Sequence, residues 1–352
     1  MNNSYIPPIA VEGKEIGGGS KTLLIGEISA NHDRDLEHSL GLVELAAKAG
    51  WDCIKLQTYS ANSLTVKSNH PSLQVDPIWG HSNLYELYES ASMPFEFHKP
   101  LFDRARELGL LPFTSIYDPI DLDFVESLEC GIYKIASFEL TYDDLLMEVS
   151  KTGKPIILST GMANLAEIHH AFNIINKNGN GKVILLHCCS AYPASLKDAN
   201  LSAIATLKNE FGCPIGYSDH TVGTIAAIAA AAMGAVAIEK HYTNDVSRKG
   251  PDHRFSATSD DLRQIAEAVS AIQTMRGDGE KKPQEVERES MQTGRRSAFA
   301  IKDLEPGHVI TPGDFRFVRP CAGIVATDRE KLIGKTLNKK VAAGMPIKYE
   351  DV

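Results

Sequence analysis

Ile215-Gly-Tyr-Ser-Asp-His-Thr221 and Ala237-Ile-Glu-Lys-His-Tyr-Thr243 are two short β-type runs that flank one alanine-rich segment at 223–233. Each run carries a histidine directly after its apolar part, His220 in the first and His241 in the second. This pattern predicts two consecutive parallel strands, whose carboxyl ends lie side by side at one mouth of a β/α barrel. Two neutral imidazoles placed there could hold one divalent metal ion and leave other positions open for catalysis. The alternative is that both histidines only form hydrogen bonds at strand ends.

The same alternation of strand and helix signals extends from about residue 21 to residue 275. Short apolar runs of strand type recur near 22–29, 52–57, 111–115, 132–136, 155–159, 182–188, 214–217 and 235–240. Helical segments lie between them, and Asn164-Leu-Ala-Glu167 has the form of a capping box that starts one helix. Eight strand–helix pairs predict an α/β fold, a (β/α)8 TIM barrel. An open doubly wound sheet is the alternative, and it is weakened because no Gly-x-Gly-x-x-Gly follows any strand.

Changes in composition predict further segments outside the barrel. Residues 1–20 are polar and rich in glycine, and we expect an N-terminal lead-in there. The barrel is expected to occupy 21–275, followed by a charged, breaker-rich linker at 276–292. Residues 293–352 carry short β-like runs and Gly/Pro turns, which predict a small β-rich second domain. The loop at 58–92 is long for a barrel, and its aromatic residues predict a packed lid.

Bulk composition excludes several classes of function. The 352 residues are 43% hydrophobic, enough for a large core, and carry a formal net charge of −9. Because nucleic acids and membrane surfaces are polyanionic, neither is an expected partner. The six cysteines lack zinc-binding spacing and indicate free thiols in a reducing compartment. Since the sequence shows neither a membrane-spanning apolar run nor an export signal, we expect a cytoplasmic protein.

Side-chain parity sorts the residues near the expected mouth, since every second strand residue enters the barrel interior. In the eighth expected strand, Glu239 and His241 share the inward face, whereas Lys240 points toward the helices and is expected to be structural. The same parity places Glu27 inside, near the mouth. The other strands add two lysines, a glutamine and three serine hydroxyls: Lys55, Lys134, Gln57, Ser137, Ser159 and Ser218.

Lysines directed into a barrel are costly to bury unless an anion meets them. Structural salt bridges to Glu27 and Glu239 are one explanation for them. Lysines beside serine hydroxyls, in a chain without a phosphate-binding glycine loop, favour instead a phosphate or carboxylate bound by side chains. We therefore predict a phosphorylated small molecule next to a metal ion.

In combination, short motifs along the chain resemble the sialic acid synthase family. They are Gly26-Glu-Ile-Ser-Ala-Asn-His32, Lys55-Leu-Gln-Thr58, Tyr133-Lys-Ile-Ala-Ser-Phe-Glu139, Ser159-Thr-Gly-Met162, Ser218-Asp-His-Thr221 and Glu239-Lys-His241. The C-terminal segment, from Arg296-Ser-Ala-Phe299 to Ile333-Gly-Lys335, is similar to the antifreeze-like (SAF) domain of those synthases. Within the family, the motif ending at His32 and the segment from Asn83 to His98 most resemble pseudaminic acid synthases.

The resemblance implies condensation of phosphoenolpyruvate with an open-chain N-acetylated amino sugar, release of phosphate and formation of a nine-carbon 2-keto acid. The pseudaminic pattern implies 2,4-diacetamido-2,4,6-trideoxy-altrose as the sugar, with N-acetylneuraminate or legionaminic acid synthesis as the alternative. It also implies a divalent metal ion, Mn²⁺ before Mg²⁺ or Co²⁺, held by His220 and His241 to polarise the aldehyde. The implied partner is a second copy of the chain in a domain-swapped homodimer.

Family roles carry over to matching positions. Phosphoenolpyruvate would be bound by Lys55, Lys134, Ser137, Ser159 and Ser218. The sugar would be contacted by Tyr192 and Asp252, and Arg319 would reach it from the C-terminal domain of the partner subunit. Gln57 and Ser190 complete the expected set of substrate-binding residues. Glu27 would position or deprotonate the attacking water, supported by Glu139 and Glu239.

Two other functions fit parts of this pattern. A metal-dependent barrel aldolase would need no phosphate clamp, so release of phosphate from phosphoenolpyruvate separates it from a synthase. A non-catalytic sugar-binding protein would release no phosphate and would bind its ligand equally well in the presence of a chelator. Buried lysines and paired carboxylates would be a needless cost in a protein that only binds a sugar.

Overall fold

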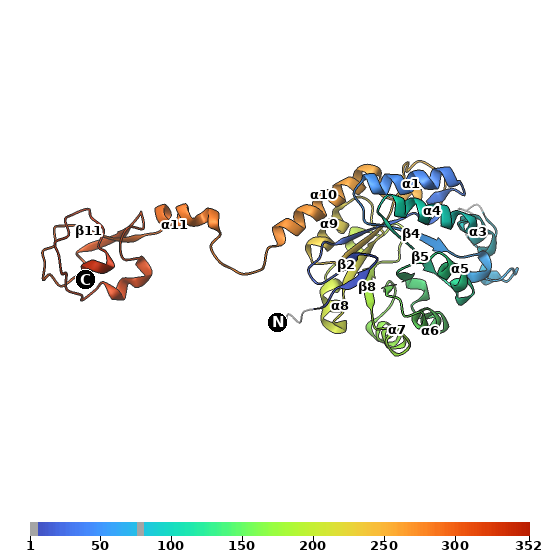
Figure 1. Cartoon of the computed structure of the whole chain (residues 1–352), viewed down its shortest axis with the longest axis horizontal. Coiled ribbons are helices and arrows are strands. Elements are labelled where there is room, and N and C mark those ends of the chain that lie inside the picture. Colours follow the sequence, from blue (N-terminus) through green and yellow to red (C-terminus); the bar gives the residue numbers. More distant parts are fainter. Residues whose placement is uncertain (1–5, 76–80) are drawn as a thin grey trace. The chain divides into compact units, whose positions relative to one another are not determined.

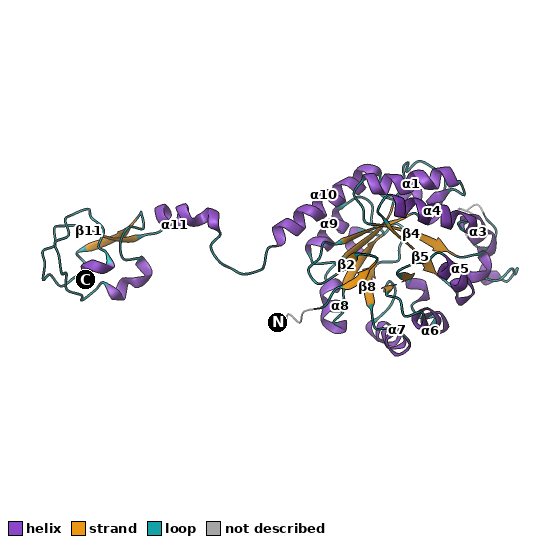
Figure 2. Cartoon of the chain, in the orientation of Figure 1, coloured by secondary structure: helices purple, strands orange, loops and turns teal. Residues whose placement is uncertain are grey.

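The chain folds into two compact units, described here from a computed structural model that covers residues 6–75 and 81–352. The first unit spans residues 1–277 and the second spans residues 278–352, and each is described by itself. Figure 1 labels the elements along the chain, and Figure 2 shows the helices of the first unit around its strands.

The first unit is a closed barrel of eight parallel strands. They are β3 (Leu23–Glu27), β4 (Cys53–Thr58), β5 (Leu111–Ile116), β6 (Tyr133–Ile135), β7 (Ile156–Ser159), β8 (Val183–Cys188), β9 (Ile215–Asp219) and β10 (Ala237–His241). The strands neighbour one another in chain order, and β10 pairs with β3 to close the ring, with His241 opposite Glu27. Each strand coincides with one of the eight apolar runs, so the predicted (β/α)8 barrel is confirmed.

Helices connect the strands and cover the outside of the barrel (Figure 2). In this unit they are α1 (Leu36–Lys48), α2 (Ala61–Leu64), α3 (Leu84–Ala91), α4 (Phe95–Glu107), α5 (Leu122–Ser127), α6 (Asp143–Lys151), α7 (Leu165–Asn178), α8 (Ala203–Phe211), α9 (Ile225–Ala232) and α10 (Ser259–Arg276). The expected capping box is present at α7, because the side chains of Asn164 and Glu167 each accept the other's backbone N–H. The alanine-rich segment forms α9 between the two histidine-bearing strands, β9 and β10.

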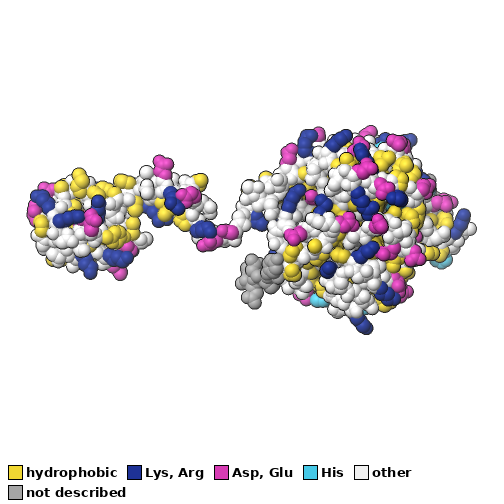
Figure 3. All heavy atoms as spheres, in the orientation of Figure 1, with side chains coloured by type: hydrophobic (Ala, Val, Ile, Leu, Met, Phe, Trp, Pro, Cys, Tyr) yellow, Lys and Arg dark blue, Asp and Glu magenta, His cyan; other side chains and the backbone are white. Residues whose placement is uncertain are grey.

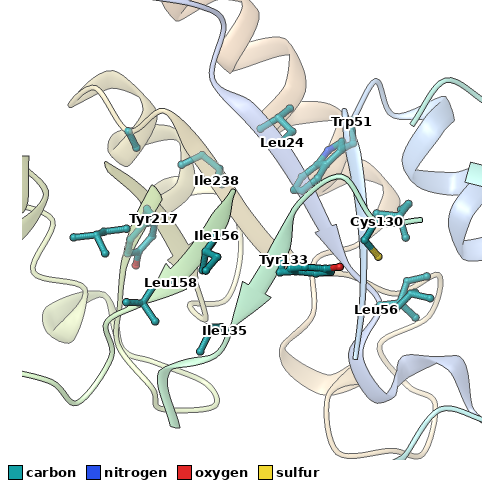
Figure 4. Close-up of a cluster of buried hydrophobic side chains, with 14 of the residues drawn as sticks. Leu24, Trp51, Leu56, Cys130, Tyr133, Ile135, Ile156, Leu158, Tyr217 and Ile238 are labelled. Atoms are coloured by element: carbon teal, nitrogen blue, oxygen red, sulfur yellow. The ribbon is translucent and has the colours of Figure 1, made fainter. Parts of the chain in front are cut away.

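Side-chain parity divides the apolar residues of the barrel into two layers. Residues such as Tyr133 and Ile135 face outward into a cluster beneath the helices, part of which is drawn in Figure 4. The alternate residues, such as Ile25 and Ile157, face inward and fill the lower part of the barrel. The inward rows continue into polar residues, since Lys55 lies two residues beyond the inward-facing Cys53. The apolar layers therefore fix which polar side chains enter the mouth.

The segment that we expected as a lead-in contains a β-hairpin. Strand β1 (Ile9–Val11) pairs with β2 (Lys14–Ile16) around Glu12 and Gly13, whose φ angles of 44° and 80° suit a two-residue hairpin turn. The side chains of Ile9, Val11 and Ile16 are buried against the inward-facing layer, with Ile16 fully buried. The hairpin thereby covers the amino-terminal end of the barrel, and its three-residue strands are too short to be recognised by sequence periodicity.

The second unit is built around a small apolar core. Its strands β11 (Ser297–Ala300) and β12 (Phe315–Val318) form an antiparallel pair. The core is formed by Ala298, Ala300, Leu304, Ile310, Phe315, Ile324, Leu332, Leu337, Val341 and Ile347. Part of the segment expected as a linker is helical, because α10 continues to Arg276 and α11 (Arg288–Gly294) begins before residue 292.

Surface charge is mixed in sign over the face of the chain drawn in Figure 3. Lysine and arginine side chains are interspersed there with aspartate and glutamate side chains rather than gathered into one field. Among the described helices, none combines the length and the apolar character needed to cross a bilayer. On the face drawn in Figure 3, positive charge does not form a field that could attract an anionic ligand.

Candidate active site

A cavity of about 600 Å³ opens where the barrel strands end. Twelve of the fifteen predicted site residues line it: Lys55, Gln57, Lys134, Ser137, Glu139, Ser159, Tyr192, Ser218, His220, Glu239, His241 and Asp252. Glu27 is buried in contact with Lys55, and Ser190 adjoins the lining residue Ser137. Arg319 is an exposed residue of the second unit, directly after β12.

One buried lysine and two buried carboxylates form a cluster in this cavity. Lys55 Nζ is in direct contact with Glu27 Oε2 and lies 3.4 Å from Glu239 Oε1. Lys55 also donates a hydrogen bond to Ser115 Oγ (3.2 Å), and Ser218 Oγ donates one to Glu239 Oε1 (2.9 Å). The salt-bridge explanation is therefore correct for Lys55, whose charge is balanced by protein carboxylates.

The two carboxylates differ in acidity although they share this lysine. Burial raises the pKa of Glu27 above its ordinary value, and the charge of Lys55 limits that rise. Burial acts in the same direction on Glu239, but the charges of Lys134 and Lys55 outweigh it and lower the pKa of Glu239 to about 2. One carboxylate with increased proton affinity beside one that stays ionised is an arrangement suited to acid–base chemistry.

Lys134 is the unmatched cation of the cavity. Its side chain is buried, and its ammonium group donates a hydrogen bond to the carbonyl of Ile135 (3.1 Å). Within residues 6–75 and 81–352, no carboxylate lies within salt-bridge distance of its Nζ. Burial therefore lowers the pKa of Lys134, and the charge of Glu239 offsets this only in part. The salt-bridge explanation fails for this lysine, and an anionic ligand could supply the missing partner.

Serine hydroxyls gather around Gly161, in the connection after β7. The backbone N–H of Gly161 donates to Ser137 Oγ (3.0 Å), and a Cβ added at Gly161 would collide with Ser190 Oγ. The hydroxyls of Ser159 and Ser190 are buried, and neither has a hydrogen-bond partner among the described residues. Buried hydroxyls without partners, next to a residue that must be glycine for steric reasons, suit the oxygens of an anion.

The two histidines at the ends of β9 and β10, His220 and His241, lie together in the cavity. The rings of His220 and His241 are 5.4 Å apart between centroids and nearly perpendicular, and Tyr192 packs 4.3 Å from the ring of His220. Burial, together with the nearby His241, lowers the pKa of His220 to about 4. His220 is therefore neutral at physiological pH, which is the form that binds metals.

These histidines fit two positions of a metal site. Nδ1 of His220 is hydrogen-bonded to the carbonyl of Cys189 (2.8 Å), which orients the ring and leaves Nε2 for a ligand. Nδ1 of His241 is buried without a hydrogen-bond partner in the part of the chain that the structure describes. When two imidazoles bind one metal ion, at about 2.1 Å per nitrogen, their rings must lie close together, and the rings of His220 and His241 lie close enough for this. The described residues contain no group of three or more His, Cys, Asp or Glu side chains arranged for a metal, so water or substrate oxygens would complete the set.

Asp252 contacts both His241 and Ser29, which lies in the connection after β3. Its Oδ2 accepts a hydrogen bond from Ser29 Oγ (2.5 Å) and lies 3.7 Å from His241 Nδ1. Gln57 Nε2 donates to the same Ser29 Oγ (3.0 Å). Burial opposes ionisation, but His241 and the Ser29 hydroxyl outweigh it and hold the pKa of Asp252 at about 2. Ser29 links two predicted site residues and was missed, although it lies within a motif that the sequence argument quotes.

Glu139 is a second candidate for proton transfer. Burial raises its pKa to about 7, and the charge of Lys134 offsets this only in part. Its Oε2 is buried without a hydrogen-bond partner among the described residues. A carboxyl group that titrates near neutral pH and lines the cavity can both donate and accept a proton.

Part of the cavity wall was not predicted. Five of the lining residues come from the insert between β4 and β5: Tyr59, Leu64, Leu87, Tyr88 and Ala91. Parity along strands says nothing about loops, and the aromatic run before Tyr88 indicated only a packed lid. Within this insert, residues 76–80 lie outside the described part. The prediction for Lys240 is confirmed, because it is buried outside the cavity and pairs with Asp219 (2.6 Å).

The fold and the cavity define a β/α-barrel protein with cations, carboxylates and two metal-type histidines at its mouth. Comparison with known proteins gives a match to the NeuB family over residues 42–281 and to the SAF domain over residues 295–352. The chain belongs to the NeuB family. The resemblance to the sialic acid synthase family and the expected antifreeze-like domain are therefore confirmed.

Individual relatives cover most of the chain. It is 36% identical to the pseudaminic acid synthase of Helicobacter pylori, over 94% of this chain and 97% of that protein. It is also 36% identical to an N,N′-diacetyllegionaminic acid synthase of Campylobacter jejuni, over 91% of this chain and 96% of that protein. Its structure is similar to the crystal structure of an N-acetylneuraminic acid synthetase from Leptospira borgpetersenii, with a TM-score of 0.73 and 32% identity over 81% of this chain and 95% of that one.

Proposed function

We propose that the protein is a phosphoenolpyruvate-dependent nonulosonic acid synthase, a transferase that makes pseudaminic acid. Its acceptor would be 2,4-diacetamido-2,4,6-trideoxy-altrose in the open-chain form. The observation that carries the proposal is Lys134, a buried cation with no carboxylate of the described residues within salt-bridge distance. Its cavity also holds two histidines and two carboxylates of unequal acidity. The Helicobacter pylori relative, a pseudaminic acid synthase, supports this acceptor.

Phosphoenolpyruvate would bind through side chains rather than through a helix terminus. Lys134 would pair with the negative charge of phosphoenolpyruvate, and the hydroxyls of Ser159 and Ser190 would donate hydrogen bonds to its oxygens. Ser137 and Ser218 would complete this set, while Lys55 would remain paired with the carboxylates. Unlike a neutral sugar, this substrate supplies the negative charge that Lys134 lacks.

The reaction would form one carbon–carbon bond and break one carbon–oxygen bond. Carbon 3 of phosphoenolpyruvate attacks the aldehyde carbon of the sugar, and water adds to carbon 2. The bond from carbon 2 to the phosphate oxygen then breaks, so that phosphate leaves with the bonding electrons and a 2-keto acid remains. Glu239, which stays ionised, would stabilise positive charge at carbon 2, and Glu27, with its increased proton affinity, would accept a proton from the water.

A divalent cation, Mn²⁺ in our proposal, would be held by His220 and His241. When bound, it would act as a Lewis acid that makes the aldehyde carbon a better electrophile. On the same side, the ionised Asp252 can accept hydrogen bonds from sugar hydroxyls, while Tyr192 presents a half-exposed ring beside His220. Glu139, with a pKa of about 7, would exchange a proton with the sugar or the solvent.

A direct test is phosphate release from phosphoenolpyruvate by the purified full-length protein with Mn²⁺. The protein is offered a panel of N-acetylated amino aldoses that begins with 2,4-diacetamido-2,4,6-trideoxy-altrose. Phosphate should appear in equal amount to the 2-keto acid and only when a suitable aldose is present. A barrel aldolase would form a product without releasing phosphate from phosphoenolpyruvate, and a sugar-binding protein would give neither product. Either result would overturn the proposal.

We also propose that the active form is a domain-swapped homodimer in which Arg319 of one subunit serves the cavity of the other. Arg319→Ala should reduce kcat/KM for the sugar about 10- to 100-fold, as expected for one hydrogen bond from a charged group. The KM for phosphoenolpyruvate should change little. Mixing this variant with His220→Ala should restore part of the activity, because one barrel of a mixed dimer then has both groups. Equal losses for both substrates, without complementation, would contradict a role across subunits.

A further inference from the structure

The reaction cavity has one apolar wall, contributed by the insert between β4 and β5. None of the five insert residues in the lining is charged, and the side chains of Leu64, Leu87 and Ala91 present only carbon atoms. The charged and imidazole groups of the lining come instead from the barrel strands or from the connections after β6, β9 and β10. The cavity is therefore divided chemically, with the charged groups on the barrel and, on the insert, the carbon side chains of Leu64, Leu87 and Ala91 beside two tyrosines.

This wall is attached firmly to the barrel. His32 Nε2 lies 3.1 Å from the carbonyl of Ala91, and the backbone N–H of Arg34 donates to His32 Nδ1 (2.9 Å). The guanidinium of Arg34 donates to the carbonyls of Glu89 (3.0 Å) and Ser92 (2.9 Å), where α3 ends. The positively charged Arg34 thus binds the helix end at which unsatisfied carbonyls gather. Both anchors belong to the connection after β3.

Aromatic rings support the same wall from the barrel side. Tyr59 packs edge to face against Tyr88 of α3, with 6.3 Å between ring centroids, and against Tyr117, with 5.2 Å. Tyr59 is itself almost fully buried. Helix α3, which carries Leu87, is therefore held at its carboxyl end by His32 and Arg34 and at Tyr88 by Tyr59. These contacts give the wall a defined shape, as selection between similar ligands requires.

We propose that Leu64, Leu87 and Ala91 receive the methyl group at carbon 6 of the acceptor, and that this wall selects 6-deoxy sugars over their 6-hydroxy counterparts. The inference rests on the proposed function and names the residues that would read one end of the acceptor. An N-acetyl group does not suit this wall, because its amide N–H and C=O would lose water without gaining a partner. A methyl group has no hydrogen bonds to lose, and it gains by leaving water.

The expected selectivity is moderate. A hydrophobic pocket rejects a ligand that merely adds a hydroxyl by a factor on the order of 100. We therefore expect kcat/KM for the 6-deoxy acceptor to exceed that for the matched 6-hydroxy sugar about 10- to 100-fold. Replacing Leu87 by asparagine, which has nearly the same shape, would give the 6-hydroxyl a hydrogen-bonding partner. The preference should then fall to about 3-fold or less, mainly by improved use of the 6-hydroxy sugar.

The experiment measures phosphate release with both sugars, phosphoenolpyruvate and Mn²⁺ for the wild-type chain and for Leu87→Asn, Leu64→Asn and Leu84→Asn. Leu84 is the matched control, since it lies on the same helix but does not line the cavity. Because Leu64, Leu84 and Leu87 are each only partly buried, these variants should fold, which thermal unfolding verifies. The KM for phosphoenolpyruvate should be the same in all four proteins.

The outcomes separate the two proposals. If the wild-type preference for the 6-deoxy sugar is lost in Leu87→Asn or Leu64→Asn but persists in Leu84→Asn, the wall is the surface that recognises the group at carbon 6. Equal use of both sugars by the wild-type chain, or a preference that survives in both cavity variants, overturns this inference and leaves the synthase standing. Failure to release phosphate with any N-acetylated amino aldose overturns the synthase itself, and this inference with it.

Discussion

Replacement of His220 or His241 by alanine should reduce phosphate release by about three orders of magnitude or more. Each variant would remove one of two imidazoles that would hold the cation, and loss of the Lewis acid is worth several kcal/mol at the transition state, with tenfold in rate for each 1.4 kcal/mol. Because His220 is neutral, His220→Ala disturbs no charge balance in the core. His241→Ala removes a group that lowers the pKa of Asp252, so the carboxyl of Asp252 should become less acidic in this variant. Both side chains line the cavity, and both variants should keep their fold.

Two measurements make this result specific. Mn²⁺ binding, followed by electron paramagnetic resonance, should weaken in parallel with activity, while the thermal unfolding midpoint changes little. His170→Ala is the matched control, because His170 is an exposed histidine on α7 that contacts Asp143 at 3.0 Å. Normal turnover in either His220→Ala or His241→Ala, or Mn²⁺ binding that is unaffected by both, would show that the two histidines serve only as hydrogen-bonding groups at strand ends.

The two lysines that line the cavity, Lys55 and Lys134, should respond in opposite ways to replacement by methionine. Lys134→Met removes a buried cation that forms no ion pair among the residues that the structure describes. The free energy of unfolding should therefore stay the same or increase by about 1–3 kcal/mol. Use of phosphoenolpyruvate should nevertheless fall by about two to three orders of magnitude, because a charged group buried against the substrate is lost. In Lys55→Met, the carboxylates of Glu27 and Glu239 would be left buried without their cation, and about 3–5 kcal/mol of stability should be lost.

Urea unfolding and steady-state kinetics on the same preparations distinguish these effects. The pair of variants is its own control, since both remove one lysine from the same cavity and substitute the same side chain. If Lys134→Met destabilised the chain as strongly as Lys55→Met, Lys134 would have a structural partner, and the anion site that we assign to it would be wrong.

The sequence was sufficient to predict the barrel and most of its inward-facing chemistry. The reason is that a strand has a period of two, so that locating His241 also fixes Glu239 inside and Lys240 outside. The same rule placed Glu27 and Lys55 correctly, but it could not say that they touch each other, which depends on the lateral pairing of β3 with β4. The alternation along strands also could not show that, among the described residues, no carboxylate lies within salt-bridge distance of Lys134.

The features that the sequence did not predict lie in segments where side chains do not alternate with a two-residue period. Ser29 and the cavity wall near Leu87 belong to connections, whose conformation depends on tertiary anchors such as the hydrogen bond from His32 to Ala91. The hairpin at the start of the chain has strands of three residues each, too few for alternation to be recognised. Arg319 follows a strand of the second unit, and its proposed role depends on an assembly of two chains.

That hairpin has a practical consequence for anyone who shortens or tags this chain. Removal of residues up to Ser20, which the sequence predicts only as a lead-in, would expose the apolar side chains at the amino-terminal end of the barrel and promote aggregation. An affinity tag fused ahead of Ile9 would leave the hairpin in place. Residues 9–16 close the end of the barrel opposite the active-site mouth and should be kept in any shortened form of the chain.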